Sequence, residues 1–198
     1  MTALPIAARG RRPQDSRTRL LGAARKLFVE GGYHATRPQD ISREAGLGHG
    51  TFYLHFADKQ ACFLAFVDDA RAELDAALSQ HTAGASDLAT AVRATLEGVY
   101  AYGAANPGVL TTAMNDAGVI AAGHATSDTL VDKWALDWAA TLHALSPSGA
   151  AVPDEDARII GAAVVGIIHE GSAYAQRHGN SPAAAIDLLT RLIVKALS

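Results

Sequence analysis

The segment Gly46–Asp58 restricts the fold of this chain more than any other part of the sequence. It reads GLGHGTFYLHFAD, and its closely spaced glycines predict a tight turn followed by a short helix. Phe52 and Phe56 are four residues apart, so they share one face of that helix and predict a buried anchor. The polar or titratable side chains of the segment are those of His49, Thr51, Tyr53 and His55. A helix this short and this polar does not form a core by itself, so other helices must support it.

The preceding segment, Thr36–Ala45, predicts a second short helix. Thr36 is a suitable N-terminal cap, and Pro38 lies in the first turn, where its missing N–H costs little. Gly46 ends this helix, so residues 37–56 give a helix, a turn and a helix. This arrangement is suited to placing the second helix in the major groove of DNA, with Lys59 beside a phosphate.

Residues 17–66 resemble the DNA-binding domain of the TetR family of transcriptional regulators. The matching segments are Arg19–Phe28, Glu30–Tyr33, Ala35–Thr36, Asp40–Leu47, Gly50–Phe56 and Lys59. The rest of the chain is similar to the family in length and helical character. The resemblance implies an all-α fold of about nine helices, with an N-terminal three-helix helix-turn-helix domain and a C-terminal helical domain for ligand binding and dimerisation.

Charge is distributed unevenly along the chain, whose formal net charge is −3. Residues 1–59 contain ten Lys and Arg and five Asp and Glu, which gives +5. Residues 60–198 contain the other seven bases and fifteen acids, which gives −8. A basic head attracts a polyanion such as DNA, whereas an acidic body does not.

Composition and motifs exclude several other classes of protein. No apolar run reaches the roughly 18 residues of a membrane span, and residues 1–12 lack the apolar region of a secretory signal. Cys62 is the only cysteine, which excludes an intramolecular disulfide and favours a cytoplasmic protein. We find no Gly-rich phosphate loop, HExxH pair or GxSxG elbow, so we expect no enzyme activity, metal or cofactor. The adjacent His169 and Glu170 diverge by about 100° on a helix and do not chelate one ion easily.

Three regions follow from these patterns: a basic flexible arm at 1–15, the DNA-binding domain at 16–60 and an effector-binding and dimerisation domain at 61–198. A disordered terminus and an arm that contacts DNA are both consistent with the arginines of residues 1–15. Helical periodicity and turn residues predict helices near 16–30, 36–45, 49–55, 59–81, 87–105, 109–116, 121 or 127–145, 154–177 and 181–197.

The resemblance places DNA contacts in and around the helix-turn-helix. Gln39 and His49 are the best candidates for base edges, since glutamine pairs well with adenine. Thr51, Tyr53 and Lys59 are suited to phosphates. Arg37 and Gly48 depart from the family, which commonly has a small hydroxyl residue and a serine-like cap at these positions. The full set of candidates is Thr36, Arg37, Gln39, Gly48, His49, Gly50, Thr51, Tyr53, His55 and Lys59.

The C-terminal region needs a ligand chamber and a dimer face if it follows the family. Polar-tipped or aromatic side chains among apolar helices are typical of a chamber, although a core or surface position is the alternative for each. The effector-binding candidates are Tyr100, Asn115, Asp116, Trp134, Trp138 and His169. Broad apolar stripes on the last two helices predict a four-helix dimer interface, with intrachain core as the alternative. The interface candidates are Ile160, Val164, Ile168, Gly171, Leu188, Leu189 and Leu192.

The expected function is that of a homodimeric, ligand-responsive transcriptional regulator of the repressor type. It would bind a palindromic double-stranded DNA operator and be released by a small apolar or amphipathic effector. A small-molecule-binding or enzymatic helical protein, without operator specificity, is the alternative. An architectural protein that binds all DNA alike is a further class, which the acidic body disfavours.

Overall fold

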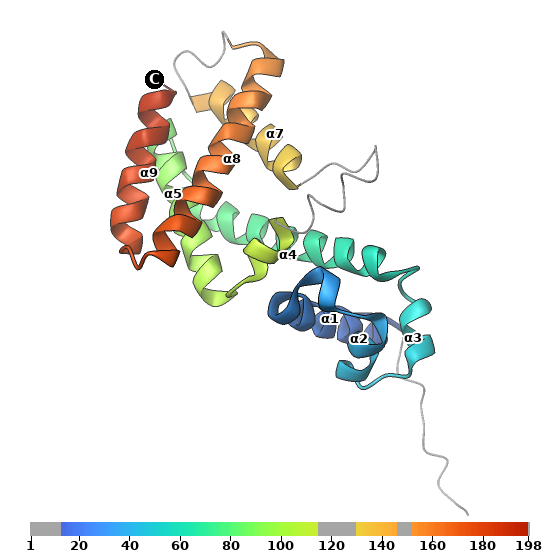
Figure 1. The fold of residues 1–198 in the computed structure, drawn as a ribbon. Coiled ribbons are helices and arrows are strands. Elements are labelled where there is room, and N and C mark those ends of the chain that lie inside the picture. The colour runs from blue at the N-terminus through green and yellow to red at the C-terminus, as the bar shows by residue number, and fades with distance from the viewer. Residues whose placement is uncertain (1–12, 115–129, 146–151, 198) are drawn as a thin grey trace, which may run out of the picture. The chain divides into compact units, whose positions relative to one another are not determined.

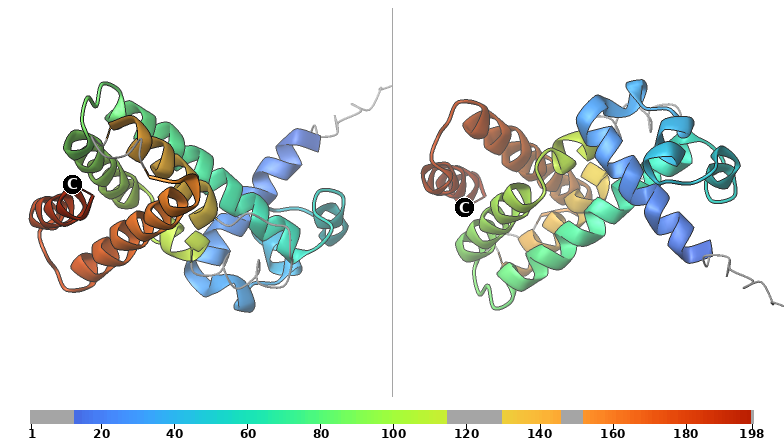
Figure 2. Two further views of the ribbon diagram at one scale, coloured as in Figure 1. Left: turned by 90° about the horizontal axis from the view of Figure 1, so that it is seen from above. Right: turned by 90° about the horizontal axis from the view of Figure 1, so that it is seen from below.

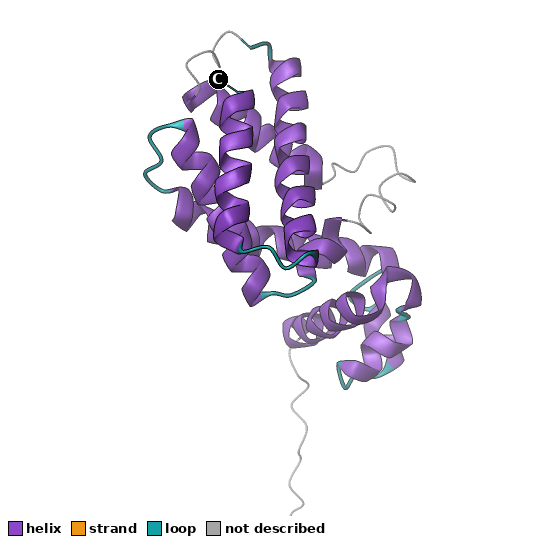
Figure 3. Cartoon of the chain, turned by 60° about the vertical axis from the view of Figure 1, so that its left-hand side comes forward, coloured by secondary structure: helices purple, strands orange, loops and turns teal. Residues whose placement is uncertain are grey.

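The computed structural model describes residues 13–114, 130–145 and 152–197, and all regular secondary structure within these ranges is helical (Figure 3). The predicted all-α fold, with a helix-turn-helix domain followed by a helical domain, is confirmed. The chain divides into two compact units, Met1–Phe66 and Val67–Ser198. The helices that begin in the first unit are α1 (Pro13–Ala35), α2 (Pro38–Glu44), α3 (His49–Tyr53) and α4 (Lys59–Thr82).

Helix α1 buries Leu20, Ala24 and Phe28, which recur on one face at helical spacing. Its helical path breaks at Gly32, where a φ of 76° favours glycine, close to the end predicted at residue 30. The helix begins at Pro13, so the predicted flexible arm is too long at its carboxyl end. The rest of that arm, residues 1–12, lies outside the described residues.

Thr36 is not the cap of α2, so this prediction is wrong. Arg37 occupies the cap position, and its side chain makes no capping hydrogen bond. The turn at Gly32 instead buries Thr36 and places its hydroxyl 2.9 Å from the Gly32 carbonyl oxygen and 3.2 Å from that of Leu27. Thr36 therefore stabilises the end of α1.

The core of the first unit is aromatic. The ring centroid of Phe28 lies 5.0 Å from that of Phe63 and 5.8 Å from that of Phe66. Phe63 and Phe66 belong to the first turns of α4. Asp58 immediately precedes this helix and caps it, because its Oδ1 accepts the Ala61 N–H at 2.7 Å. Because these two rings pack on α1, the first unit extends beyond the boundary predicted at residue 60.

The second unit is a helical bundle. After the carboxyl-terminal part of α4 come α5 (Leu88–Ala105), a helical segment at residues 109–114, α7 (Leu130–Leu145), α8 (Asp154–Arg177) and α9 (Pro182–Ala196). Figures 1 and 2 show α9 beside α5 and α8, and α7 between α8 and α4. The parts of the predicted helices that fall at 115–129 lie outside the described residues.

Three helices supply the main core of this unit. Its buried side chains are Leu88, Val92 and Leu96 from α5, Val164 and Ile168 from α8, and Ile186, Leu189 and Ile193 from α9. Helix α7 approaches α8 so closely that a Cβ atom on Gly161 would lie 2.2 Å from the Ala135 carbonyl oxygen. None of the helices formed by the described residues is long and apolar enough to cross a membrane.

Candidate DNA-binding surface and effector cavity

Helix α3 is anchored on one side and exposed on the other. Phe52 is fully buried and Phe56 nearly so, as the sequence predicts. Tyr53 is 52% exposed, and its ring packs edge-on against that of His49 with centroids 5.3 Å apart. The buried phenylalanines therefore fix α3 while His49 and Tyr53 face outward.

Most of the candidate DNA contacts lie on the surface of the first unit. Thr36 is the exception, since it is buried with its hydroxyl engaged, and we remove it from the set. The exposed candidates are Arg37, Gln39, Gly48, His49, Gly50 and Tyr53, and the half-buried ones are Thr51, His55 and Lys59. Leu54, which was not predicted, is 80% exposed. Its exposure could have been predicted from its position, because Leu54 does not lie on the helix face shared by Phe52 and Phe56.

Arg19 of α1 holds the turn between α2 and α3. Its Nη2 donates to the carbonyl oxygens of Ala45 and, at 3.4 Å, of Gly46. Gly46 has a φ of 63°, and a Cβ there would lie 3.1 Å from the same Nη2. Glycine at position 46 therefore allows both the left-handed backbone of the turn and the close approach of the Arg19 guanidinium.

Lys59 is anchored at the start of α4. Its Nζ donates to the Tyr33 carbonyl oxygen at 2.9 Å and lies 4.1 Å from the centroid of the Tyr33 ring. Burial lowers the pKa of Lys59 from its ordinary value. An ammonium has three N–H donors, so this contact leaves donors for a phosphate.

Several cations of the first unit are already neutralised. Lys26 pairs with Glu44 at 2.7 Å, and Arg43 pairs with Asp40 at 2.6 Å. Arg37 is exposed, and within the described part of the chain its side chain has no hydrogen bond or ion pair. Arg37 is therefore the cation beside α2 that is most available to a phosphate or a base.

The predicted dimer residues fall into two groups. Val164, Ile168 and Leu189 are buried in the core of their own chain, so assigning them to a subunit interface is wrong. Gly171 approaches the same core, since a Cβ there would lie 2.7 Å from a Leu189 methyl group. Ile160 is half-buried against this core.

The other two predicted dimer residues are exposed on α9. Leu188 is 59% exposed and Leu192 is 52% exposed. Ile159 and Tyr174 of α8 are also exposed, although the sequence reasoning missed them. These four residues form the revised candidate interface.

A cavity of about 650 Å³ lies within the second unit. Three of the effector-binding candidates, Trp134, Trp138 and His169, line it, whereas Tyr100 packs against the helical core instead. Asn115 and Asp116 lie outside the described residues. The lining residues come from α4, α5, α7, α8 and the segment at 109–114.

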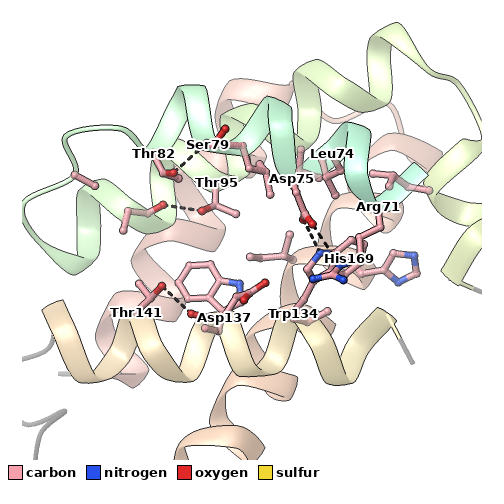
Figure 4. Close-up of a pocket in the computed structure, with 18 of the residues that line it drawn as sticks. Arg71, Leu74, Asp75, Ser79, Thr82, Thr95, Trp134, Asp137, Thr141 and His169 are labelled. Atoms are coloured by element: carbon pink, nitrogen blue, oxygen red, sulfur yellow. Dashed lines mark hydrogen bonds and ion pairs between the residues drawn. The ribbon is translucent and has the colours of Figure 1, made fainter. Parts of the chain in front are cut away.

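Charged side chains gather in one part of this cavity, where α4 faces α7 and α8 (Figure 4). Asp75 Oδ1 accepts the Trp134 indole N–H at 3.2 Å, and Asp75 Oδ2 lies 3.3 Å from Arg71 Nε. Burial raises the pKa of Asp137, an effect that Arg71 opposes and Asp75 reinforces. Arg71, Asp75 and Asp137 were not predicted, because charged residues on a helix usually lie in solvent.

The described residues contain no cluster of three His, Cys, Asp or Glu side chains that could hold a metal ion. His169 Nδ1 lies 3.1 Å from Glu170 Oε1, so these two side chains interact with each other. His169 Nε2 is buried and has no hydrogen-bond partner among the residues that the structure describes.

Comparison with known sequences identifies relatives of the first unit. A sequence model of the bacterial regulatory proteins of the tetR family matches residues 20–66. The HTH-type transcriptional regulator UidR of Escherichia coli (strain K12) is 39% identical over 54 residues, 27% of this chain and 28% of UidR. The HTH-type transcriptional repressor AcnR of Corynebacterium efficiens is 33% identical over 90 residues, 46% of this chain and 45% of AcnR. The matched segments thus span less than half the length of these relatives.

Solved structures share the fold of the whole chain. A TetR-like transcriptional regulator from Rhodococcus sp. RHA1 has a TM-score of 0.69 at 20% identity, over 96% of this chain and 98% of that one. The fatty acid degradation regulator FadR from Bacillus halodurans has a TM-score of 0.65 at 14% identity, over 94% and 96%. These relatives and neighbours are regulators rather than enzymes. The helix-turn-helix residues and the match at residues 20–66 show that the first unit contains a DNA-binding domain of the tetR family, and the whole chain shares the fold of TetR-like regulators.

Proposed function

We propose that this protein is a cytoplasmic transcriptional repressor that binds a palindromic DNA operator as a homodimer and leaves it when a small molecule fills the cavity. The observation that carries the proposal is the exposed polar edge of α3 and α2 on a unit with a formal charge of +5. The relative AcnR is named a repressor, which supports repression over activation.

In this proposal the exposed and half-buried candidates divide into two kinds of DNA contact. Gln39 and His49 read base edges in the major groove, because both are exposed beside the anchored α3. Arg37, Tyr53 and Lys59 contact phosphates, which position the helix without reading sequence. Two copies of α3 would enter successive major grooves about 34–36 Å apart.

The exposed apolar residues of α8 and α9 form the subunit interface in this proposal. Ile159, Tyr174, Leu188 and Leu192 would be buried by the same residues of a second copy, as a two-fold axis requires. Their burial removes apolar surface of both subunits from water, which favours association. The core residues Val164, Ile168 and Leu189 support this face from behind.

The cavity is the effector site in this proposal. It is lined by α4, which also begins in the DNA-binding unit, so a ligand that changes the preferred state of α4 acts on a helix common to both units. The effector can shift the DNA-binding equilibrium only by its difference in affinity for the two states. An amphipathic effector suits the mixture of apolar and charged lining.

Selection of bound duplexes from a random DNA pool tests the proposal. We expect a palindrome to be enriched, and affinity for it to fall steeply with salt because several phosphates are neutralised. Gln39→Ala or His49→Ala should cost about 1–3 kcal/mol and relax the preference at particular base pairs, whereas Tyr53→Phe should weaken all duplexes alike. Equal binding to every duplex would leave the alternative, a small-molecule-binding or enzymatic protein without operator specificity.

A further inference from the structure

The cavity in the second unit has the size and walls of a site for an amphipathic small molecule. Its volume of about 650 Å³ lies in the usual range of roughly 300–1,000 Å³ for ligand pockets. Most of the lining is aliphatic or aromatic, and includes Leu74, Leu78, Val99, Leu110, Leu145 and Ile168. The tail of such a ligand therefore has an apolar surface to cover.

The charges of the lining are unbalanced. Two carboxylates, Asp75 and Asp137, line the cavity with one guanidinium, Arg71. Arg71 already pairs with Asp75, at 3.3 Å, and Asp75 also accepts the Trp134 indole N–H. The Asp137 carbonyl oxygen accepts the Thr141 hydroxyl at 2.9 Å, but the Asp137 carboxylate has no hydrogen bond or ion pair among the described residues. Among the described lining residues, the aspartates thus outnumber the guanidinium by one, and the carboxylate without a counter-ion is that of Asp137.

Two side chains of this region, Asp137 and His169, have acceptor atoms without a hydrogen bond among the described residues, whereas Arg71 Nε, which also lacks a hydrogen bond, is ion-paired with Asp75. A carboxylate such as Asp137 is an acceptor only. When His169 donates its Nδ1 proton to Glu170, its buried and unpartnered Nε2 is also an acceptor. A ligand that complements both must bring N–H or O–H donors.

The two tryptophans of the lining are a further reason to expect a cationic head group. Trp134 and Trp138 line the cavity one helical turn apart on α7, the helix that carries Asp137. The face of an indole ring attracts a cation, and this attraction grows when water is excluded. A negatively charged head group gains nothing from such a face.

From this geometry we infer that the effector is an amphipathic organic cation, whose protonated amine lies against Asp137 and whose apolar part lies along the aliphatic walls. That this ligand regulates DNA binding rests on the proposed function, whereas its chemical class is inferred from the cavity alone. A fatty acid would place its carboxylate among Asp75 and Asp137, where Arg71, the one guanidinium among the described lining residues, is already paired, so like charges would oppose its binding.

Three ligands with the same tail and different head groups test this inference on the full-length protein. Dodecylamine is cationic at neutral pH, dodecanol is neutral and dodecanoate is anionic, and each is titrated below its micellar concentration. Affinities come from tryptophan fluorescence, which reports Trp134 and Trp138 only, and from calorimetry. We expect dodecylamine to bind about tenfold or more tightly than either of the others, because it alone forms charge-assisted hydrogen bonds.

A pair of variants locates the preference. Asp137→Asn should remove most of the advantage of dodecylamine over dodecanol. Asp69→Asn removes the same charge from an exposed position of α4 that does not line the cavity, and should leave the advantage unchanged. The ranking of the three affinities is measured on the wild-type protein, so this test does not depend on the correct folding of a variant.

The outcomes separate this inference from the proposed function. Tighter binding of dodecanoate, equal binding of all three, or no binding of any would overturn the cationic class, even if operator binding were intact. Preferential binding of dodecylamine that Asp137→Asn abolishes would establish the class. Operator affinity measured with and without bound dodecylamine then tests the regulatory function independently.

Discussion

The contact between α7 and α8 gives a test of how the cavity is held together. Gly161 of α8 faces the backbone of α7, and a Cβ there would lie 2.2 Å from the Ala135 carbonyl oxygen. Carbon and oxygen atoms in close contact are ordinarily about 3.3–3.6 Å apart. The shortfall is about 1 Å, and a backbone carbonyl, unlike the end of a side chain, has no rotamer to relieve it. In Gly161→Ala the two helices must therefore separate.

The size of the effect follows from two opposing contributions. Overpacking of a close contact costs about 1–3 kcal/mol or more. Alanine in place of glycine in a helix gains up to about 1 kcal/mol. Gly103→Ala in α5 is the matched control, because nothing lies within 4 Å of the added methyl group. The propensity gain is similar in both variants, so the difference between them, about 1–3 kcal/mol, isolates the cost of the contact.

Urea denaturation followed by tryptophan fluorescence measures this difference. Both tryptophans lie on α7, so the signal reports the unit in which the contact occurs. We expect Gly161→Ala to unfold at lower urea concentration than Gly103→Ala and to lose affinity for cavity ligands. Equal stability of the two variants would refute the reasoning, since it would mean that α7 and α8 separate at no cost.

Four further predictions concern single side chains. Arg37→Ala should weaken binding to all duplexes and reduce the salt dependence by about one phosphate contact, as measured in a salt titration; an unchanged slope would remove Arg37 from the surface. Leu188→Asp should give a folded monomer in sedimentation because Leu188 is exposed, whereas the buried Leu189→Asp should unfold the second unit; a dimeric Leu188→Asp protein would contradict the revised interface. Burial raises the pKa of Asp137 in the folded protein above 3.8, so with rising pH this carboxyl ionises in the unfolded chain before it ionises in the folded protein. The free energy of unfolding should therefore fall as the pH rises from about 4 through the raised pKa, and Asp137→Asn should lack this pH dependence in melting curves. Burial raises the pKa of Cys62 to about 12, so a thiol reagent should label it only on unfolding, and rapid labelling of the native protein would show the burial to be wrong.

The helices were predictable because their signals are local. Helix α8 has the predicted bounds, Asp154–Arg177, since Pro153 precedes it and glycine follows soon after its end. The predicted starts of α4 and α5, at residues 59 and 87, agree with the structure to within one residue, and Asp58 and Asp87 cap these helices by accepting a backbone N–H three residues on. The cap assigned to Thr36 was wrong because its hydroxyl has better-placed acceptors across the turn at Gly32, and no pattern in the sequence records that approach.

The dimer face shows where periodicity stops being informative. Leu188 and Leu189 are neighbours of the same type on the same helix, yet one is exposed and the other is buried against α5 and α8. A broad apolar stripe indicates that a helix is buried on more than one side. It does not say which side faces its own chain, because that depends on how α5, α8 and α9 pack.

The uneven charge of the sequence gains a second meaning from the cavity. The formal charge of −8 on residues 60–198 keeps this part of the protein off DNA, and it also raises the local concentration of organic cations. The formal charge of +5 on residues 1–59 has the opposite effects: it attracts DNA and repels organic cations. Asp137, which no motif singled out, is where this general preference becomes a specific one, because its carboxylate lines a mainly apolar cavity and has no ion-pair partner among the described residues. One charge pattern thus favours DNA at one unit and a cationic ligand at the other.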